Sequence, residues 1–286
     1  MKKIAFIGTG VMGKSMVMNL MKKGFEVTIY ARNRQKVEDL ISNGAIFCDT
    51  IESCVKNKDA IITIVGYPKD VEEVYFSQKG IVNSASKNSY LIDMTTTSPK
   101  LSVQIYNSAK QKGLKALDAP VSGGDMGAKN GTLSIMVGGD KEDFEACKEI
   151  FQAMGTTILH EGKAGNGQHT KMANQIAIAG LMAGINEAIA YGKKTGLDIE
   201  TMIKSISNGS AQSFHMTNSA PKMNKRDFSA GFYIKHVVKD LRIANEEVSG
   251  LKVLKDVLEM YETLEKNGDG ELGTQALCKY YEIDKK

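Results

Sequence analysis

The chain has 286 residues, of which 42% are hydrophobic and 24% charged, a balance typical of a water-soluble globular protein long enough for two domains. Its 37 basic and 33 acidic residues leave a net charge of only +4 without a basic block, which argues against nucleic acid as a partner. The 4 cysteines form no Cys-x-x-Cys pair, and no apolar stretch reaches the length of a membrane span. We therefore expect a cytoplasmic protein without a disulfide framework, a structural zinc site or a membrane partner.

Short apolar runs alternate with amphipathic stretches in the first half of the chain. The apolar runs predict strands, and the amphipathic stretches predict the helices that connect them. Expected strands span residues 4–7, 26–30, 60–65, 90–93, 115–118, 133–137 and 157–159, and expected helices span residues 12–23, 34–43, 101–112 and 142–154. Because parallel strands need long crossover connections, this alternation predicts a mostly parallel sheet with helices on both faces.

A glycine-rich turn joins the first expected strand to the first expected helix, and it reads Gly8-Thr9-Gly10-Val11-Met12-Gly13. In this position the first glycine permits the tight turn, the second lets the backbone approach a pyrophosphate, and the third lets helix and strand pack closely. The turn therefore predicts that a dinucleotide binds at the start of the first helix. The alternative interpretation is a Rossmann-like turn that binds nothing.

The end of the second expected strand indicates which dinucleotide is preferred. NAD-preferring sites usually have Asp or Glu there, which holds the ribose 2′-hydroxyl. This chain instead reads Tyr30-Ala-Arg32-Asn33-Arg34, without an acid. Arg32 is suited to pair with a 2′-phosphate, and Asn33 and Arg34 offer further donors. The segment favours NADP(H), with NAD(H) as the alternative cofactor; in the other interpretation both arginines are solvated residues at a helix start.

Two later segments carry polar groups suited to a small substrate. The bend that follows Asp118-Ala-Pro-Val consists of Ser122, Gly123 and Gly124, whose hydroxyl and N–H groups can form a nest for a carboxylate, although it can also be a simple turn. At the start of a long helical pattern, Lys171, Asn174 and Gln175 project from one face. A lysine in a helix rich in Ala, Ile and Met is unusual unless it is functional or solvated, and periodicity alone favours a solvated lysine.

After Gly167 the strand signal disappears, and helical patterns fill the rest of the chain. Expected helices span residues 168–195, 199–207, 234–249 and 252–266. The predicted fold is α/β: an N-terminal Rossmann domain (1–163) with a doubly wound, mostly parallel sheet, linked by a long helix to an all-α domain (164–286).

Four segments of the chain, taken together, resemble the motifs of one enzyme family. They are Gly8-x-Gly10-x-Met12-Gly13, Asp118-Ala-Pro-Val-Ser-Gly-Gly124, Gly165-x-Gly-x-x-x-Lys171-x-x-Asn174 and Lys239-Asp240. The family is the β-hydroxyacid dehydrogenases, which include 3-hydroxyisobutyrate dehydrogenase, tartronate semialdehyde reductase and glyoxylate/succinic semialdehyde reductase. The resemblance covers nearly the whole chain and implies an NAD(P)-dependent enzyme that forms a homodimer or homotetramer through its helical domain.

The resemblance also implies roles for individual residues. Lys171 matches the general acid/base of the family, and the bend at 122–124 matches the residues that hold the substrate carboxylate. Further residues implied on the substrate side are Asn174, Gln175, Phe232 and Asp240. Those implied on the cofactor side are Val65, Gly66, Thr96, which matches a threonine against the nicotinamide ribose, and Lys239. Many members carry a second Asn where this chain has Gln175, and the Asn-Gln pair resembles that of tartronate semialdehyde reductases.

The implied chemistry is hydride transfer between a nicotinamide and a short aldehyde or β-hydroxyacid that carries a carboxylate. An ammonium beside the carbonyl oxygen stabilises the negative charge that forms there and delivers the proton. A free lysine, with a pKa of about 10.4, is already an acid at neutral pH, so Lys171 and Arg32 together favour an NADPH-preferring reductase.

Three alternatives stay open at this point. They are an imine reductase, which usually lacks the lysine found here at position 171, a non-catalytic dinucleotide sensor or scaffold, and an NAD-dependent 3-hydroxyisobutyrate dehydrogenase. A metal site is not expected, because the 4 histidines show no ligand spacing.

Overall fold

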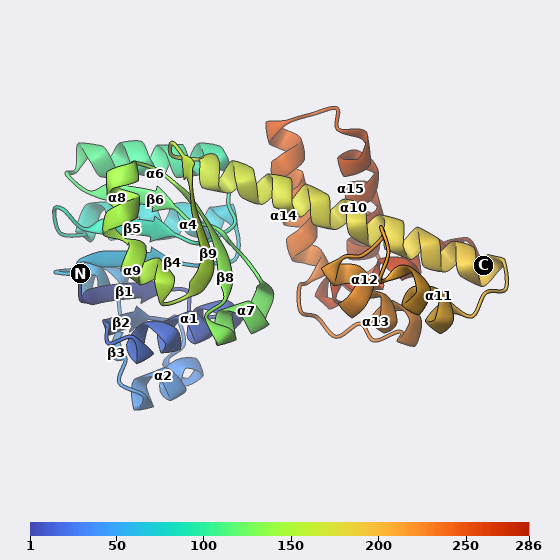
Figure 1. The fold of residues 1–286 in the computed structure, drawn as a ribbon. Coiled ribbons are helices and arrows are strands. Elements are labelled where there is room, and N and C mark those ends of the chain that lie inside the picture. The colour runs from blue at the N-terminus through green and yellow to red at the C-terminus, as the bar shows by residue number, and fades with distance from the viewer. Residues whose placement is uncertain (286) are drawn as a thin grey trace. The chain divides into compact units, whose positions relative to one another are not determined.

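The computed structural model describes residues 1–285, and backbone packing divides the chain into two compact units, Met1–Lys171 and Met172–Lys286. The first unit contains the sheet and the second is helical, as the labelled elements of Figure 1 show. Within residues 1–285, no helix combines the length and the apolar character that crossing a membrane requires.

A nine-stranded sheet forms the first unit, with the order β3-β2-β1-β4-β5-β6-β8-β7 and with β9 paired to β8. The strands are β1 Lys3–Ile7, β2 Glu26–Tyr30, β3 Ile46–Cys48, β4 Ala60–Thr63, β5 Tyr90–Asp93, β6 Lys115–Asp118, β7 Val121–Ser122, β8 Leu133–Gly138 and β9 Gly155–Gly162. Pairing is parallel from β3 through β6 and between β8 and β9, whereas β8 runs antiparallel to β6 and β7. The prediction of a doubly wound, mostly parallel sheet is confirmed, and its strand order reverses between β1 and β4, where ligands of such sheets bind.

Apolar side chains of β1 alternate between the two faces of the sheet. Ile4 and Phe6 belong to a buried cluster that includes Leu20 of helix α1, whereas Ala5 and Ile7 belong to the cluster on the opposite face. Because successive side chains of a strand point to opposite faces, a run that is apolar at every position requires cover on both sides. The burial of both clusters confirms the expected helical layers on the two faces of the sheet.

The helical segments of the first unit before α10 are α1 Val11–Lys22, η1 Arg34–Val37, α2 Glu38–Ser42, α3 Ile51–Val55, α4 Pro68–Phe76, α5 Ile81–Ser84, α6 Pro99–Gln111, α7 Gly124–Asn130, α8 Lys141–Ala146 and α9 Lys148–Gln152. Two single helices predicted from the sequence are wrong, because non-helical backbone angles at Val37 and Cys147 divide each of them into two segments. The strand predicted to reach residue 65 ends at Thr63. Strand β3 and helices α3 and α5 were not predicted, since elements this short have too few positions to show a period.

Helices fill the second unit, and α10 begins in the first unit and continues through the second. They are α10 Asn166–Lys194, α11 Ile199–Ile206, α12 Phe214–Asn218, α13 Ala220–Lys225, α14 Ile234–Glu247, α15 Lys252–Lys266, η2 Asp269–Glu271 and η3 Thr274–Lys285. The four helices expected from periodicity are confirmed with ends that differ by one or two residues at most, and the two short helices α12 and α13 were missed.

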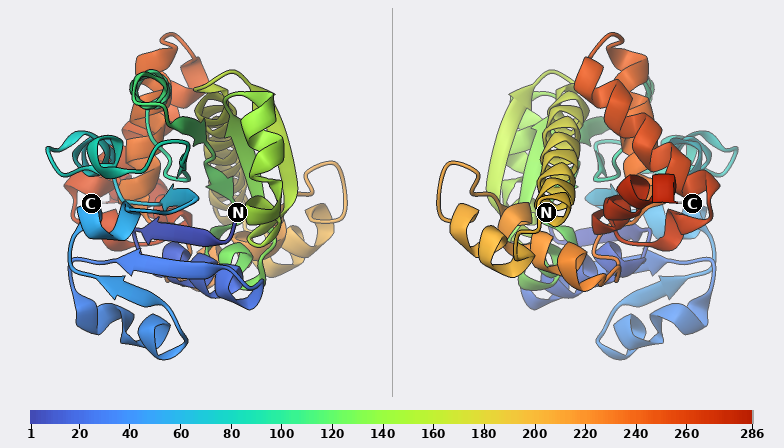
Figure 2. Two further views of the ribbon diagram at one scale, coloured as in Figure 1. Left: turned by 90° about the vertical axis from the view of Figure 1, so that its left-hand side faces the viewer. Right: turned by 90° about the vertical axis from the view of Figure 1, so that its right-hand side faces the viewer.

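The core of the second unit forms where the apolar stripes of α14 and α15 meet. Both stripes have helical spacing, and their buried members include Ile234, Val237, Val238 and Leu241 on α14 and Leu254, Val257, Leu258 and Tyr261 on α15. The buried Tyr261 hydroxyl donates to the carbonyl oxygen of Thr274 at 3.1 Å. This bond ties α15 to η3, the red segment that runs beside it in the right-hand panel of Figure 2.

Candidate active site

In the turn between β1 and α1, close packing requires two of the three glycines, whereas the third borders open space. Gly8 has a φ of +101°, and a Cβ there would collide with the carbonyl oxygen of Ile64. A Cβ at Gly13 would collide with the carbonyl oxygen of Gly8. Around Gly10, by contrast, nothing lies within 4 Å of the position that a Cβ would take. The fold itself therefore explains the first and third glycines, and the second leaves a cradle that a ligand can approach.

The first turn of α1 presents unpaired backbone donors beside this cradle. The first amide of the turn that bonds within the chain is that of Lys14, which donates to Gly10 O at 2.9 Å. The N–H groups of Val11 and Met12 have no acceptor among the described residues, and the Val11 side chain is 68% exposed. Free N–H groups and the helix dipole attract an anion, so this end of α1 fits a pyrophosphate.

The three polar residues after β2 differ in whether their side chains already contact other residues of the protein. Asn33 Oδ1 accepts a hydrogen bond from Gln35 N at 3.0 Å and so caps η1. The Arg34 guanidinium lies 5.2 Å from the ring centroid of Phe47, and its Nε is 3.9 Å from a carboxylate oxygen of Glu38. Arg32 is exposed and makes no hydrogen bond or ion pair with any described residue. Of the three, Arg32 is therefore the cation available to a bound anion.

Adjacent strand ends bring the β1 turn together with the segments that follow β4 and β5. The amide of Val65 donates to the hydroxyl of Thr95 at 3.0 Å, and Val65 also borders the space beside Gly8. Gly66 lies next in the chain, and Thr96 is half-buried between two buried threonines. Because these segments leave the carboxyl edge of three neighbouring strands, the predicted residues of the turn, Val65, Gly66 and Thr96 lie along one edge of the sheet.

The predicted bend after β6 and β7 lies in the first unit as well. Ser122 pairs with Ser134 of β8, and Gly123 and Gly124 then adopt φ values of +127° and +63° to begin α7. Helix α7 packs against α1, where Asn19 Nδ2 donates to a carbonyl oxygen of α7 at 2.7 Å. Nothing lies within 4 Å of a Cβ position at Gly124, so the bend has space for a small anion.

Asp118, at the end of β6, holds the start of α10 in place. Its carboxylate accepts the N–H of Gly165 at 2.7 Å and that of Gln168 at 3.0 Å. Burial raises the pKa of Asp118 above its ordinary value, while these two hydrogen bonds favour the carboxylate form. Lys171 follows on the first turns of the same helix and is only 7% exposed. The structure therefore excludes the interpretation of Lys171 as a solvated surface lysine.

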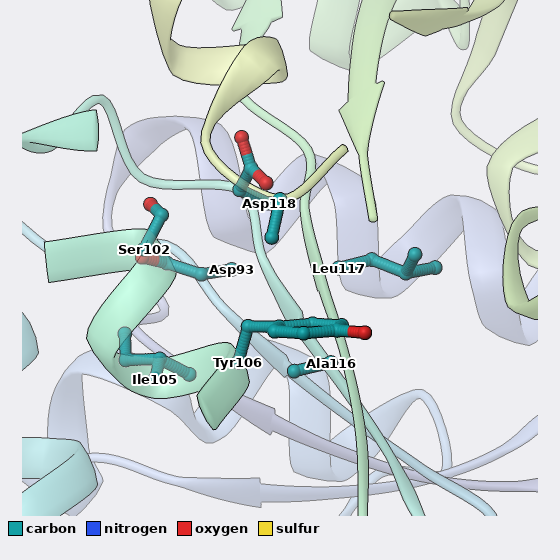
Figure 3. Close-up of a pocket in the computed structure, with 8 residues that line it drawn as sticks. Asp93, Ser102, Ile105, Tyr106, Ala116, Leu117 and Asp118 are labelled. Atoms are coloured by element: carbon teal, nitrogen blue, oxygen red, sulfur yellow. The ribbon is translucent and has the colours of Figure 1, made fainter. Parts of the chain in front are cut away.

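A small cavity lies between α6 and the carboxyl ends of β5 and β6 (Figure 3). It has a volume of about 10 Å³, and Asp93, Ser102 and Asp118 contribute polar groups to its wall. Asp93 Oδ1 accepts hydrogen bonds from Thr63 Oγ1 at 2.8 Å and Thr95 N at 3.1 Å, but Asp93 Oδ2 and the Ser102 hydroxyl have no hydrogen-bond partner among the described residues. Burial raises the pKa of Asp93 to about 6. The cavity can hold about one water molecule and is too small for a substrate.

In the second unit, a chain of side chains joins α10 to α14. Asn174 Nδ2 donates to Gln175 Oε1 at 2.8 Å, and Gln175 Nε2 donates to Asp240 Oδ2 at 2.5 Å. Lys239 Nζ lies 3.0 Å from Asp240 Oδ1. Since a carboxylate can only accept, Asp240 fixes the orientation of the Gln175 amide and, through it, that of Asn174. Four of the predicted residues thus form one hydrogen-bonded and ion-paired group.

Phe232, the remaining predicted residue of the second unit, lies two residues before the start of α14 at Ile234. Its half-buried ring lies with its centroid 6.1 Å from that of His236, one turn into the helix. Burial, together with the charge of Lys239, lowers the pKa of His236 below its ordinary value. His236 was not selected from the sequence, because a single histidine at a helical position resembles a core residue.

Gln168 is the polar residue of the first unit that sequence reasoning missed. It is fully buried and bonds to the backbone on both sides of Thr96. The sequence signal that could have identified Gln168 was an amide side chain three positions before Lys171. It lies in a segment that was interpreted only as the glycine-rich start of a helix. Among the described residues, no group of His, Cys, Asp or Glu side chains is arranged to hold a metal ion.

Comparisons with known proteins agree with this geometry. Residues 3–162 match the family described as the NAD binding domain of 6-phosphogluconate dehydrogenase, and residues 165–281 match that described as NAD-binding of NADP-dependent 3-hydroxyisobutyrate dehydrogenase. An uncharacterized oxidoreductase of Bacillus subtilis is 50% identical over 98% of this chain and 99% of its own length. A probable mitochondrial 3-hydroxyisobutyrate dehydrogenase-like protein of Arabidopsis thaliana is 42% identical over 96% of this chain and 84% of its own. The solved structure of 3-hydroxyisobutyrate dehydrogenase from Mycobacterium tuberculosis with L-serine has a TM-score of 0.90 at 26% identity, covering 98% of this chain and 99% of that one.

The glycine cradle, the donors of α1 and the doubly wound sheet suit a dinucleotide, and together with the family matches they identify the chain as a nicotinamide-dependent oxidoreductase. More narrowly, the chain belongs to the β-hydroxyacid dehydrogenase family, as the sequence motifs predicted. It is an NAD(P)-dependent oxidoreductase of the 3-hydroxyisobutyrate dehydrogenase and tartronate semialdehyde reductase type, which acts on CH–OH donors. The open space at Gly10 fits the dinucleotide that this family uses.

Proposed function

We propose that this enzyme is an NADPH-preferring reductase of short aldehydes that carry a carboxylate, with Lys171 as the general acid/base. The observation that carries the proposal is the burial of Lys171, which is 7% exposed at the start of α10. Burying a lysine without a function is costly, because its ammonium loses the solvation of water. The amine lies on the helix that Asp118 fixes to the sheet, which supports its assignment as the proton donor.

The proposed roles divide the predicted residues between cofactor and substrate. The cofactor is held by the turn at 8–13, by Val65, Gly66 and Thr96 at the neighbouring strand ends, and by Lys239. The substrate carboxylate is held by the bend at 122–124, whose serine hydroxyl and backbone N–H groups suit an anion. The other substrate-binding residues in this proposal are Asn174, Gln175, Phe232 and Asp240.

The proton transfer follows from the chemistry of a lysine side chain. When bound, the nicotinamide supplies a hydride to the aldehyde carbon and is itself oxidised. The C=O π bond breaks as the hydride arrives, and its electron pair moves onto the oxygen. Lys171 donates an Nζ proton to that oxygen, which completes the alcohol and leaves a neutral amine to be reprotonated from solvent. In the opposite direction, the neutral amine accepts the hydroxyl proton.

Preference for NADPH is supported by the charges that follow β2. Arg32 has no partner among the described residues, and no acid stands at the end of this strand to repel a 2′-phosphate. A guanidinium can bind a phosphate group through two parallel hydrogen bonds, which a ribose hydroxyl does not offer. NADH is the second cofactor in this proposal, and it is expected to bind more weakly.

The proposed domain boundary and assembly follow the same division of roles. Residues 1–163 form the dinucleotide-binding domain, which also carries the bend at 122–124. Residues 164–286 form the helical domain, which supplies the other substrate contacts, Lys239 and the contacts of a homodimer or homotetramer. Assembly through the helical part is supported by apolar side chains that remain exposed there: Leu181 on α10 is 45% exposed and Val253 on α15 is 60% exposed. The two helices lie close together, since a Cβ at Gly180 would be in van der Waals contact with Val253.

The replacement Lys171→Ala tests the proposed function. We expect this variant to bind NADPH as the parent does and to lose turnover by about 10²- to 10⁴-fold, the range for a general acid/base. Binding can be followed through NADPH fluorescence, because the chain contains 0 tryptophans. Turnover is measured with succinic semialdehyde, glyoxylate, tartronate semialdehyde and methylmalonate semialdehyde, each with both cofactors.

Two outcomes would contradict the proposal. A near-normal kcat for Lys171→Ala would remove Lys171 from the chemistry. Binding of NADPH by the parent enzyme without consumption of any aldehyde in the panel would favour the alternative of a dinucleotide sensor. The control is Lys193→Ala, which removes an exposed lysine from the last turn of the same helix and is expected to leave kcat unchanged.

A further inference from the structure

The Gln168 side chain bonds to the backbone on both sides of Thr96. Its Nε2 donates to the carbonyl oxygen of Thr95 at 2.7 Å, and its Oε1 accepts from the amide of Thr97 at 3.1 Å. One strand of a sheet bonds to its neighbour in the same way, by one donor and one acceptor directed at the residues that flank a single position. An amide offers both groups at once, whereas a hydroxyl or a carboxylate of the same reach does not offer them in this arrangement.

The backbone of Gln168 is fixed as firmly as its side chain. Its N–H donates to Asp118 Oδ2 at 3.0 Å, while Asp118 Oδ1 accepts from Gly165 at 2.7 Å. A Cβ at Gly167 would collide with the carbonyl oxygen of Met136 in β8, so α10 starts in direct contact with the sheet. The first turn of α10 is therefore tied to the ends of β5, β6 and β8, all within the first unit.

The segment around Thr96 is also held from the side of the sheet. The Thr95 amide donates to Asp93 Oδ1 at 3.1 Å, and the Thr95 hydroxyl accepts from the amide of Val65 at 3.0 Å. Asp93 is itself bonded to Thr63 at 2.8 Å. Thr95 thus has its amide fixed by Asp93 of β5, its hydroxyl fixed by Val65 in the segment after β4, and its carbonyl fixed by Gln168 of α10.

We propose that Gln168 is a positioning residue, which sets the distance between Thr96 and the turn of α10 that carries Lys171. The inference rests on the proposed function, in which Thr96 lies against the nicotinamide ribose and Lys171 transfers the proton. Lys171 follows Gln168 by three positions, so both lie on neighbouring turns of one helix face. Hydride and proton must reach two atoms of the same carbonyl group, and a misplacement of about 1 Å can reduce the rate about 10²-fold.

The first variant for the test is Gln168→Met, which keeps the length of the side chain and removes both hydrogen bonds. It leaves the Thr95 carbonyl and the Thr97 amide buried without partners. We expect kcat to fall about 10- to 100-fold, while the dissociation constant of NADPH changes less than about threefold, because the glycine turn and Arg32 are untouched. The second unit and the β1 turn keep all their contacts in this variant.

The second variant is Gln168→Glu, for which a purely structural role and a positioning role of Gln168 predict different results. As a carboxylate, the new side chain accepts from Thr97 but repels the carbonyl oxygen of Thr95. As a neutral acid, it donates to Thr95 and accepts from Thr97, so both bonds are restored. Burial raises the pKa of such an acid above its ordinary value of about 4.3. We therefore expect the ratio of variant kcat to parent kcat to rise as the pH falls.

We compare the ratio of variant kcat to parent kcat, and not the variant kcat alone, because two other acidic side chains lie close to residue 168. Asp118 bonds to the Gln168 backbone, and Asp93 bonds to Thr95, so both titrate in parent and variant alike. The matched control is Ser89→Ala, which removes a buried hydrogen bond of 2.6 Å to Lys58 O at the opposite, amino-terminal edge of the sheet. It is expected to lower the melting temperature and to leave kcat and its pH profile unchanged.

The inference is overturned if Gln168→Met keeps kcat within about twofold of the parent, or if the kcat ratio of Gln168→Glu is independent of pH. Should Gln168→Met fail to fold, the pH dependence of Gln168→Glu decides alone. These results are separate from the test of the proposed function. An inactive Lys171→Ala with fully active Gln168 variants refutes the positioning role only, whereas an active Lys171→Ala refutes the assignment on which it rests.

Discussion

Arg32 stands at the end of β2 as an exposed cation, while its neighbours are already occupied by a helix cap and by an aromatic ring. The proposed preference for NADPH therefore depends mainly on one side chain. Asn33 can still offer its NH₂ group, but its oxygen is committed to Gln35. Arg34 is already placed over Phe47, so it supports the shape of the turn more than it offers a free charge.

The replacement Arg32→Asp should shift the enzyme toward NADH. It removes charge-assisted hydrogen bonds worth about 1.5–3 kcal/mol and puts a carboxylate where a 2′-phosphate would lie. We expect the ratio of kcat/KM for NADPH to that for NADH to fall about 10- to 100-fold. The control is Lys36→Asp, an exposed residue of the same turn with the same change of charge. Equal cofactor ratios in the parent and Arg32→Asp would show that this turn does not contact the 2′ position.

At the scale of elements, the β1–α1 turn contains one glycine that the packing of the fold requires and another that only a bound ligand would require. Gly13 has no room for a methyl group even in the free protein, whereas Gly10 has room and an ordinary φ of −75°. An Ala at position 13 must move the backbone or the strand beneath it, which costs about 1–3 kcal/mol. An Ala at position 10 meets open space, and only a bound ligand would meet its methyl group.

We therefore predict opposite effects for two similar substitutions. Gly13→Ala lowers the free energy of unfolding without any ligand present. Gly10→Ala leaves that free energy within about 0.5 kcal/mol of the parent value and weakens NADPH binding about tenfold or more. Thermal unfolding of the free protein and a fluorescence titration with NADPH measure the two quantities. If Gly10→Ala binds NADPH as tightly as the parent, the dinucleotide backbone does not pass over this turn.

How much could be predicted from the sequence depends on element length and on whether contacts are local. The long periodic helices α10, α14 and α15 and the apolar strands β1, β2 and β5 were predicted close to their observed ends. Short elements such as β3 and α5 were not, because three or four residues carry no period. The turn at 8–13 was found because its spacing is local. Gln168 was missed because its partners, Thr95 and Thr97, are distant in the chain and only the fold brings them together.

At the scale of the whole molecule, the free energy of unfolding depends on pH partly through acidic side chains that are buried in the folded protein. Asp93 has a folded-state pKa of about 6, with burial as the main cause. This lies above the unfolded value of about 3.9, so the folded state binds the proton more tightly. The stability that this group contributes is present below about pH 4 and is lost as the pH rises through about 6. At pH 8, Asp93 is charged, and its buried Oδ2 has no hydrogen bond from any residue between 1 and 285.

Asp59 shows the opposite behaviour and provides a comparison within the same unit. Its carboxylate accepts the amides of Lys2 at 2.6 Å and Lys3 at 2.9 Å. These backbone hydrogen bonds lower the pKa of Asp59 below its ordinary value. A lowered pKa contributes stability above the unfolded value, and this stability is lost as the pH falls through the folded one. The two acids should therefore respond with opposite signs when each is made neutral.

The replacement Asp93→Asn should make the protein more stable at pH 8, by up to about 3 kcal/mol, and should have much less effect at pH 4.5. An amide at this position still accepts from Thr63 and Thr95 through its oxygen, and its NH₂ group places a donor on the wall of the cavity that Ser102 also lines. Asp59→Asn, the control, should instead lower the stability at pH 8. Urea unfolding of both variants and the parent at the two pH values measures these differences. A destabilising effect of Asp93→Asn at pH 8 equal to that at pH 4.5 would mean that the pKa of Asp93 is not raised in the folded protein, contrary to the expected effect of its burial.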